Sequence, residues 1–384
     1  KIRDIAYLPL RLDRQEPEKT ARQYGNALDL RESPVKCLNA VAGDRPAVLI
    51  LDQLDAIRWT LRHSLGALEV CKELVGEVKS LRATGKQFSV VLACRTYDMQ
   101  NDPEIKNWLQ SEEQKGGRSV EIAVEPLSTK AVAKVVETLG QNPGHMSARQ
   151  RDILQCPQHL AMWAQLVQEQ GAFEFQSRVQ LMRQYWSSRL REMAKWNVRE
   201  HDANCALAAV VEHMERSGRF CAPRTVVTDT IALDALCACG LITAQGGALT
   251  FSHQSYLDYQ IATRVVREIH ANSQSICAWL GSRDRQTLHR REPLRQALCL
   301  LADESADQFL TAIKTLLDSD GVRFHLKHLC LEVIGQLDQP SHTLLAYLKE
   351  LVITDKWKEH ILGTVCSGAS PFVRFLLDDG TFLE

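Results

Sequence analysis

The sequence lacks the features that mark secreted, membrane-spanning and strongly charged proteins. Its 12 cysteines are scattered singly with no C-x-x-C pair, so we expect free thiols in a reducing cytoplasm rather than disulfides or structural zinc. The longest apolar runs, 47–51 and 90–94, fall far short of the ~20 residues that span a bilayer. The 46 basic and 47 acidic residues give a net charge of −1, which provides no general reason to expect nucleic acid or a membrane as a partner.

Motifs of two common enzyme classes are also missing. There is no G-x-S-x-G elbow for a serine hydrolase and no G-x-G-x-x-G fingerprint for a dinucleotide. The chain begins Lys-Ile-Arg-Asp, without Met or an apolar leader, so we interpret it as a piece of a longer protein. At 45% apolar residues, the 384-residue chain has ample material for two or three folded domains.

The first ~125 residues alternate between strand-like and helix-like segments. Continuous apolar runs are typical of strands buried on both faces of a parallel sheet, and here they cover 5–10, 47–51, 88–93 and 120–124. Residues 61–81 have the helical spacing expected of a crossover connection. The polar stretch 98–119, with Gly116 and Gly117, predicts a mobile excursion before the last strand. Together these segments predict a doubly wound α/β domain.

The rest of the chain is predicted to be mainly helical. Ser128 is expected to cap the first helix, and the helix at 176–196 has a basic face that we interpret as solvated surface rather than a nucleic-acid site. The pattern of residues ~203–270 predicts two helices followed by a hairpin with a Gly-Gly turn, which is the outline of a winged helix. After ~290, successive short helices indicate HEAT-like repeats or an irregular bundle. We therefore predict four domains, at 1–127, 128–200, 201–272 and 273–384.

Two buried strands end in charged residues. Asp52 and Asp55 follow the run 47–51, and Arg95 follows the run 88–93. The carboxyl ends of parallel strands share one edge, where α/β proteins bind ligands. There Asp52 can hold Mg²⁺ beside a nucleotide, Asp55 can polarise a water, and Arg95 can meet a γ-phosphate. The simpler interpretation is that Asp55 caps the next helix and Arg95 pairs with a surface carboxylate such as Asp98.

A second candidate constellation lies near the C-terminus. His325, His328 and Cys330 share one predicted helix, and the spacing of the two histidines permits shared metal ligation. No acidic third ligand is obvious nearby, so we favour a solvated or capped helix face over a metal site.

Four pieces of the sequence, in order, resemble STAND-class P-loop NTPases of the NACHT or AP-ATPase kind. D-Q-L-D at 52–55 resembles a Walker B motif, and L-A-C-R at 92–95 resembles sensor 1. C-P-Q-H-L at 156–160 resembles the Pro-containing motif of the helical lid, and F-S-H-Q-S-Y-L-D-Y at 251–259 resembles the F-x-H motif of the winged helix. The resemblance implies that Pro157 lies near an adenine and that His253 contacts the β-phosphate of ADP. It covers roughly residues 1–270.

The chain departs from this family in one respect. It contains no G-x-x-x-x-G-K-[ST], the loop that cradles the phosphates. In the family this loop follows the first strand, which lies in mid-sheet. We therefore expect a P-loop NTPase-like sheet that lacks its first, central strand, followed by a helical lid, a winged helix and HEAT-like helices. Either the P-loop lies upstream, or the chain is a degenerate member that binds no nucleotide.

The resemblance implies an ATP/ADP-dependent signalling switch that hydrolyses ATP with Mg²⁺ held at Asp52. A protein trigger, such as a viral protein, is expected to act through the C-terminal helices. Homo-oligomerisation is expected on activation, and the resemblance implies a role in cytoplasmic antiviral defence. Contact with nucleic acid is expected only through an effector domain outside this chain, and contact with a membrane is not expected. A non-catalytic helical scaffold with a relic NTPase domain is the first alternative. A winged-helix transcription regulator is the second, and the absence of Lys and Arg from 230–239 argues against it.

Overall fold

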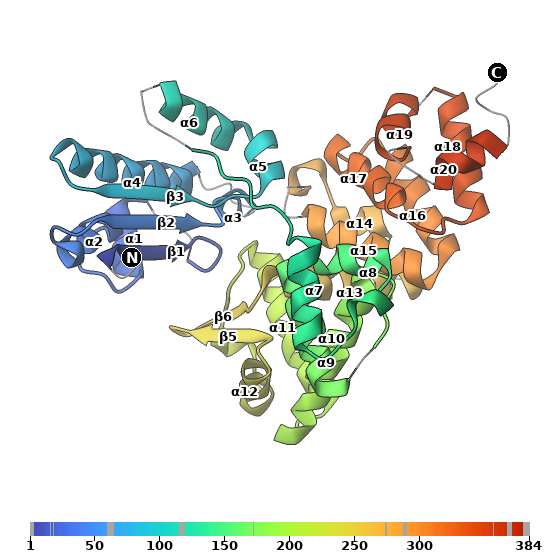
Figure 1. Ribbon diagram of the computed structural model, residues 1–384, viewed down its shortest axis with the longest axis horizontal. Helices are drawn as coiled ribbons and strands as arrows, with labels where there is room; N and C mark the ends of the chain where they lie inside the picture. Colours follow the sequence, from blue (N-terminus) through green and yellow to red (C-terminus); the bar gives the residue numbers. More distant parts are fainter. Residues whose placement is uncertain are drawn as a thin grey trace. The chain divides into compact units, whose positions relative to one another are not determined.

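The computed structural model is helix-rich with one small parallel sheet (Figure 1). It describes residues 4–15, 17, 19–59, 65–114, 120–171, 173–272, 275–286, 290–355, 357–366 and 371–378. The chain divides into two compact units: the first comprises residues 1–125, 212–226 and 244–250, and the second comprises 126–211, 227–243 and 251–384. No helix among the described residues is long and apolar enough to cross a membrane. The division into four domains stays a prediction.

The first unit contains the parallel sheet. Its strands are β1 (Ala6–Arg11), β2 (Ala47–Asp52) and β3 (Phe88–Leu92), in the spatial order β1-β2-β3. Its helices are α1 (Ala21–Ala27), α2 (Pro34–Ala42), α3 (Ala56–Trp59), α4 (Leu65–Ala83), α5 (Thr96–Asn101) and α6 (Pro103–Gln114). The predicted strands at 5–10, 47–51 and 88–93 are thus confirmed to within a residue, as is their parallel direction.

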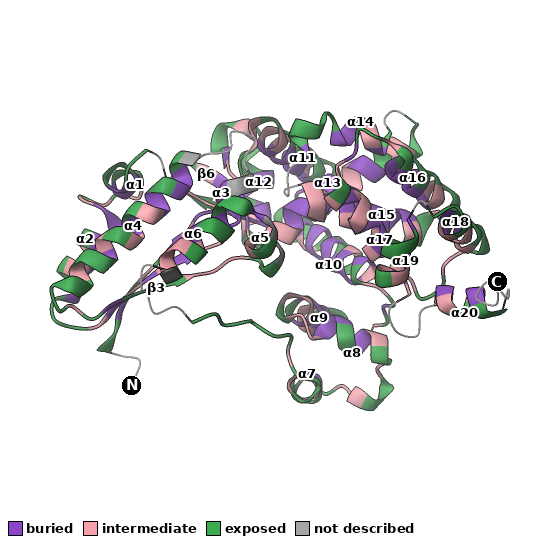
Figure 2. Ribbon diagram, turned by 90° about the horizontal axis from the view of Figure 1, so that it is seen from above, coloured by how far each residue is buried: buried purple, intermediate pink, exposed green. Residues whose placement is uncertain are grey.

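Burial in the sheet alternates along each strand, which corrects the prediction of strands buried on both faces. Helices α2 and α4 pack on one face, where Leu49 and Leu51 are fully buried. On the other face Tyr7 is 65% exposed and Val91 48% exposed. Figure 2 shows the corresponding division along α4, where buried and exposed residues alternate at helical spacing. A continuous run of apolar residues therefore does not show whether helices cover both faces of a sheet or only one.

The middle of the sheet has no gap for an absent strand. Strand β2 pairs with β1 from Ala47 to Asp52 and with β3 from Ala47 to Leu51, in unbroken parallel register. An absent strand would therefore lie beyond these three strands rather than between them, and the expectation that the sheet lacks its first strand stays a prediction. The pairing also continues beyond the strands, because the Ala93 amide donates to the Leu51 carbonyl and the Leu54 amide donates to the Ala93 carbonyl.

The stretch 98–119 is not a loop excursion where the structure describes it. Helices α5 and α6 occupy most of it, while Gly116 and Gly117 lie outside the described residues. The Asp102 carboxylate accepts the backbone amides of Glu104 and Ile105, and Pro103 occupies the first helical position. Ile105 and Trp108 are buried in the core of the unit. They stand three positions apart, a helical spacing that is hard to recognise in a polar sequence.

The predicted fourth strand, at 120–124, does not form. The structure gives these residues no helix or strand, and their side chains are exposed. The prediction treated 120–124 as a continuous apolar run, although Glu121 interrupts it, and a strand also needs a paired neighbour.

The helix predicted to follow Ser128 forms with the expected cap. The Ser128 side chain accepts the amide of Ala131 and caps the first helix. The helices of this region are α7 (Thr129–Thr138), α8 (Ala148–Leu154), α9 (Pro157–Gln170), α10 (Arg178–Glu192), α11 (Glu200–Ser217), α12 (Thr230–Ala238), α13 (Gln254–His270) and α14 (Ile276–Leu280). A small second sheet has the order β4-β6-β5, with strands β4 (Ala222–Pro223), β5 (Ile242–Gln245) and β6 (Ala248–Phe251). Strands β5 and β6 stand at the predicted Gly-Gly hairpin.

The basic residues of α10 pair within the second unit. Arg189 is only 3% exposed and pairs with Glu169 of α9 and with Glu192. Arg183 pairs with Asp303 and Glu304. These pairs account for two cations of the basic face without a nucleic-acid partner.

Helices in the last hundred residues pack on their near neighbours in the chain. They are α15 (Arg291–Glu304), α16 (Ala306–Asp318), α17 (Phe324–Gly335), α18 (His342–Ile353), α19 (Lys358–Thr364) and α20 (Pro371–Asp378). Helix α15 packs on α16 and α17, α17 packs on α19, and α18 packs on α19 and α20. This succession is typical of a helical array, and Phe309, Ile313 and Leu316, which share one face of α16, are buried.

Candidate functional site at the carboxyl edge of the parallel sheet

The chain turns sharply where β2 ends. Asp52 is the last residue of the strand and is partly buried. Gln53, which follows it, has a φ of 60°, in the left-handed region that residues other than glycine seldom adopt. The Ala56 amide donates to the Gln53 carbonyl and closes the turn. Such strain persists only where neighbouring contacts fix the backbone, and it is common at functional sites.

Asp55 joins the ends of β2 and β3. Its carboxylate accepts the backbone amide of Arg95 at 3.2 Å, and its Oδ2 atom lies 3.6 Å from Nε of the Arg95 guanidinium. The Asp55 side chain is 2% exposed, whereas that of Arg95 is 43% exposed. Asp55 is therefore held by the residue after the neighbouring strand, a contact that differs from the expected helix cap.

Burial changes the acid–base behaviour of this pair. It raises the pKa of the Asp55 carboxyl above its ordinary value, and the Arg95 guanidinium and amide offset this only in part. The nearby charge of Asp52 raises the Asp55 pKa a little further. Asp52, Asp55 and Arg95 thus form one electrostatic group at the edge of the sheet where the sequence predicts it.

His253 and the start of α9 come together in the second unit. His253 is the N-cap of α13, and its Nδ1 atom accepts the backbone amide of Ser255 at 3.2 Å. A neutral ring in this position carries its proton on Nε2, which is then a donor for an anionic oxygen. The Ser255 hydroxyl lies 2.9 Å from His253 Nδ1 and also accepts the side-chain amide of Gln158.

Pro157 occupies the first position of α9, and Cys156 is the N-cap. Burial raises the pKa of the Cys156 thiol, but hydrogen bonds from the His159 side chain and from the His159 and Gln158 amides outweigh burial and lower the pKa to about 7. The Nδ1 atom of His159 lies 3.1 Å from the Ile153 carbonyl. Sequence reasoning missed Cys156, Gln158 and Ser255 as participants, although all three stand within the quoted motifs.

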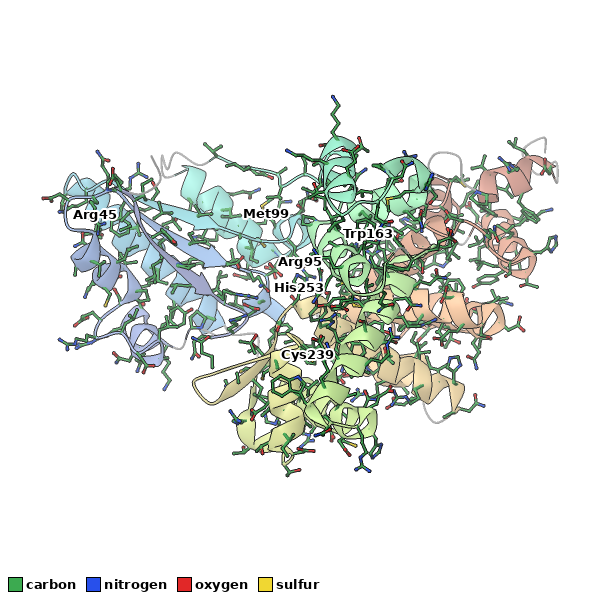
Figure 3. The ribbon with its side chains drawn as sticks, turned by 60° about the horizontal axis from the view of Figure 1, so that its bottom comes forward. Arg45, Arg95, Met99, Trp163, Cys239 and His253 are labelled. Carbon is green, nitrogen blue, oxygen red and sulfur yellow. The ribbon has the colours of Figure 1, made fainter. Side chains whose placement is uncertain are left out.

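The five predicted site residues fall into two groups. The structure brings Asp52, Asp55 and Arg95 together in the first unit. It places Pro157 and His253 on adjoining helix starts in the second unit. Figure 3 labels Arg95 after β3 and His253 before α13. Their assignment to nucleotide binding stays a prediction.

The second candidate constellation gives no metal site in the part of the chain that the structure describes. His328 pairs with Glu332, which also pairs with Arg291 and Arg295. Burial, with help from neighbouring arginines, lowers the pKa of His325 to about 4. Cys330 is fully buried.

No family model matches the sequence, and no curated protein matches it. Among solved structures, the chain is similar to the structure of the ORC2 protein of Aeropyrum pernix in its ADPNP–ADP complexes. The identity is 13%, the TM-score is 0.29, and the match covers 68% of this chain and 79% of that one. A likeness this weak carries no argument about function, so the proposals below depend on the residues themselves.

Proposed function

We propose that the protein is a nucleotide-dependent switch that binds ATP and ADP with Mg²⁺, as the STAND-like motifs predict. The main support is the group at the carboxyl edge of the parallel sheet. An acidic residue ends the central strand, a strained turn follows it, and a buried carboxylate holds the arginine after the next strand. An α/β protein binds ligands at this edge.

The donor chemistry at Asp52 fits Mg²⁺, which prefers carboxylate oxygens and retains several of its waters. Bound there, the ion would neutralise phosphate charge during hydrolysis. Asp55 was predicted to polarise a water, and that role remains a proposal. Its contacts with the Arg95 backbone and guanidinium favour a positioning role, in which it holds a half-exposed cation at the edge where a γ-phosphate is expected.

His253 and Pro157 serve the ADP-bound state in this proposal. The tautomer inferred for His253 presents a donor suited to a phosphate oxygen. Helices α9 and α13 both begin here, and the positive ends of helix dipoles favour anions. A protein trigger acting on α15–α20, homo-oligomerisation on activation and a role in antiviral defence complete the proposal by resemblance.

The proposal is tested by measuring Mg²⁺–ATP and ADP affinity in single variants. Asp52→Asn removes a metal ligand and is expected to weaken Mg²⁺–ATP binding by about tenfold or more. Arg95→Ala is expected to weaken ATP more than ADP. Asp44→Asn and Arg45→Ala, which precede β2 at the opposite end of the sheet, are matched controls expected to bind as the unaltered protein does. Unaltered Mg²⁺–ATP affinity in Asp52→Asn would contradict the assignment of Asp52 to the metal. Equal losses of ATP and ADP affinity in Arg95→Ala would contradict the assignment of Arg95 to the γ-phosphate.

A non-catalytic scaffold is the second candidate, and one observation favours it. The sequence contains no G-x-x-x-x-G-K-[ST], the loop whose amides and lysine hold nucleotide phosphates in this family. The helical array would then bind protein partners, and the Asp55–Arg95 contact would only stabilise the sheet. This candidate predicts no nucleotide affinity in any variant, which separates it from the switch.

A further inference from the structure

His253 is exposed to solvent, yet its ring is held on one side by Ser255. The Nδ1 atom accepts the Ser255 backbone amide at 3.2 Å, and the Ser255 hydroxyl lies 2.9 Å from the same atom. An exposed side chain ordinarily keeps its rotamer freedom, because fixing it costs conformational entropy. Holding an exposed ring in this way is expected where the orientation of the ring matters.

A helix cap accounts for only one of these contacts. To cap α13, the His253 ring has to accept the Ser255 backbone amide and nothing more. The Ser255 hydroxyl oxygen also accepts the side-chain amide of Gln158, which stands at the start of α9, 97 positions away in the sequence. Both helices belong to the second unit. The Gln158 contact therefore connects α9 to the His253 ring through Ser255 without being needed for the cap.

The donors and acceptors of these contacts have one consistent direction. The side-chain nitrogen of Gln158 donates to the Ser255 hydroxyl oxygen, which leaves the hydroxyl hydrogen for another acceptor. Nδ1 of His253 is that acceptor, because it already accepts an amide and carries no proton in the neutral ring. When one histidine nitrogen accepts hydrogen bonds, the ring proton is placed on the other nitrogen. The contacts thus select the tautomer with its proton on Nε2.

Aromatic packing restricts the same ring. The centroids of the His253 and Tyr256 rings lie 6.0 Å apart, and Tyr256 stacks on Tyr185 of α10 at 5.8 Å. Tyr256 is only 7% exposed, so its ring is anchored inside the second unit. Because Ser255 binds Nδ1 and Tyr256 limits rotation, the direction of the Nε2–H group is fixed.

We propose that Gln158 and Ser255 are positioning residues for His253. Gln158 orients the Ser255 hydroxyl, the hydroxyl keeps Nδ1 as an acceptor, and the ring then presents Nε2–H as a donor to a phosphate oxygen of ADP. The identity of the ligand rests on the proposed function above. The retention of ADP then depends on a contact between the first turns of α9 and α13, and not on His253 alone.

Ser255→Ala tests the proposal most sharply, because it removes the hydroxyl and keeps the backbone amide that caps α13. The protonation of His253 is read by long-range proton–nitrogen NMR of the full chain with ¹⁵N-labelled histidine, and His253→Asn identifies the His253 signals. We expect Ser255→Ala to reduce the Nε2-protonated fraction and to speed ADP dissociation about three- to tenfold, as for the loss of one hydrogen bond. Ser255→Thr restores a hydroxyl and is expected to reverse both changes.

Gln158→Glu reverses the first contact instead of removing it. A carboxylate accepts the hydrogen of the Ser255 hydroxyl, which Nδ1 of His253 then loses, so a reduced Nε2-protonated fraction is expected here as well. Gln168→Glu is the matched control, because Gln168 is exposed on the same helix and receives the same charge. It is expected to leave the His253 signals and ADP dissociation unchanged.

Unchanged His253 signals in both Ser255→Ala and Gln158→Glu would overturn the proposal, whatever happens to ADP. Altered signals with unchanged ADP dissociation would also overturn it, because the orientation of the ring would then not matter to the ligand. An unaltered protein that binds no ADP would contradict the proposed function instead. The NMR comparison needs no nucleotide, so it would still test the contacts between Gln158, Ser255 and His253.

Discussion

Asp55 is a buried carboxylate that accepts the backbone amide of Arg95, just after the next strand, β3. Replacing it with alanine leaves the Arg95 amide without its acceptor, and we expect a loss of about 1–3 kcal/mol in the free energy of unfolding. Asp55→Asn retains an acceptor oxygen and is expected to lose much less. Denaturant unfolding of both variants measures the difference. Equal stability of the two variants would show that the contact contributes little.

The raised pKa of Asp55 predicts how the free energy of unfolding changes with pH. Because burial raises the Asp55 pKa, the folded protein holds this proton more tightly than the unfolded chain does. Its contribution to stability is therefore present at acid pH and declines as pH rises from the unfolded pKa through the raised folded one. The unfolding free energy of Asp55→Asn relative to the unaltered protein should rise across this interval. A difference that is independent of pH would contradict the raised pKa.

His253 combines a structural contact with a proposed ligand contact, and two substitutions separate them. His253→Ala removes the N-cap of α13 and is expected to cost about 0.5–2 kcal/mol of stability. Asn is a good N-cap residue, so His253→Asn is expected to recover that stability. Neither variant supplies the imidazole Nε2 donor, so both are expected to release ADP faster. Normal ADP retention in His253→Asn would contradict the proposed contact between His253 and ADP.

Sequence patterns located these residues but not their contacts. Charged residues after two apolar runs were enough to place Asp52, Asp55 and Arg95 at one edge of a sheet. The capture of the Arg95 amide by Asp55 depends on the register between β2 and β3, which no local pattern encodes. In the same way, His253 stands in a motif, but Gln158 meets Ser255 only through tertiary packing.

The start of helix α9 gives a prediction at the scale of an element. Burial opposes ionisation of the Cys156 thiol, but the His159 side chain and the first amides of the helix lower its pKa to about 7. We expect its alkylation rate to reach half of its maximum near pH 7, and His159→Ala to move that midpoint upward. Cys277 is a matched control, because it is also partly buried and burial raises its pKa.

Peptide mass spectrometry after timed exposure to iodoacetamide measures both rates in one sample. At pH 7 Cys156 is expected to react clearly faster than Cys277. Equal rates, or a midpoint in His159→Ala that does not move, would show that the helix start does not activate the thiol.

Helices and strands were predicted correctly where apolar residues recur at a clear helical or strand spacing. They were missed where few apolar residues stand in a polar sequence. Three parallel strands, the Ser128-capped helix and the Gly-Gly hairpin all stand at their predicted residues. Helix α6 was missed because only a few apolar residues, among them Ile105 and Trp108, anchor an otherwise polar helix. The two-sided sheet was wrong because a run of apolar residues does not reveal which face a helix covers.

For the whole molecule, the central claim is that the chain binds an adenine nucleotide. The predicted contacts are divided between its two compact units, Asp52, Asp55 and Arg95 in one and Pro157 and His253 in the other. A ligand that binds one state of a protein more tightly than another shifts the equilibrium between those states by the difference in its binding free energy. A scaffold needs no such ligand.

The most direct test is to purify the protein from its native source, denature it, and identify and quantify the released nucleotide by chromatography. The switch predicts about one ADP per chain. It further predicts a lower occupancy in His253→Asn, with the fold preserved. Protein that is folded but releases no adenine nucleotide, and that takes up none when Mg²⁺ and ADP are added, would contradict the switch and favour the scaffold.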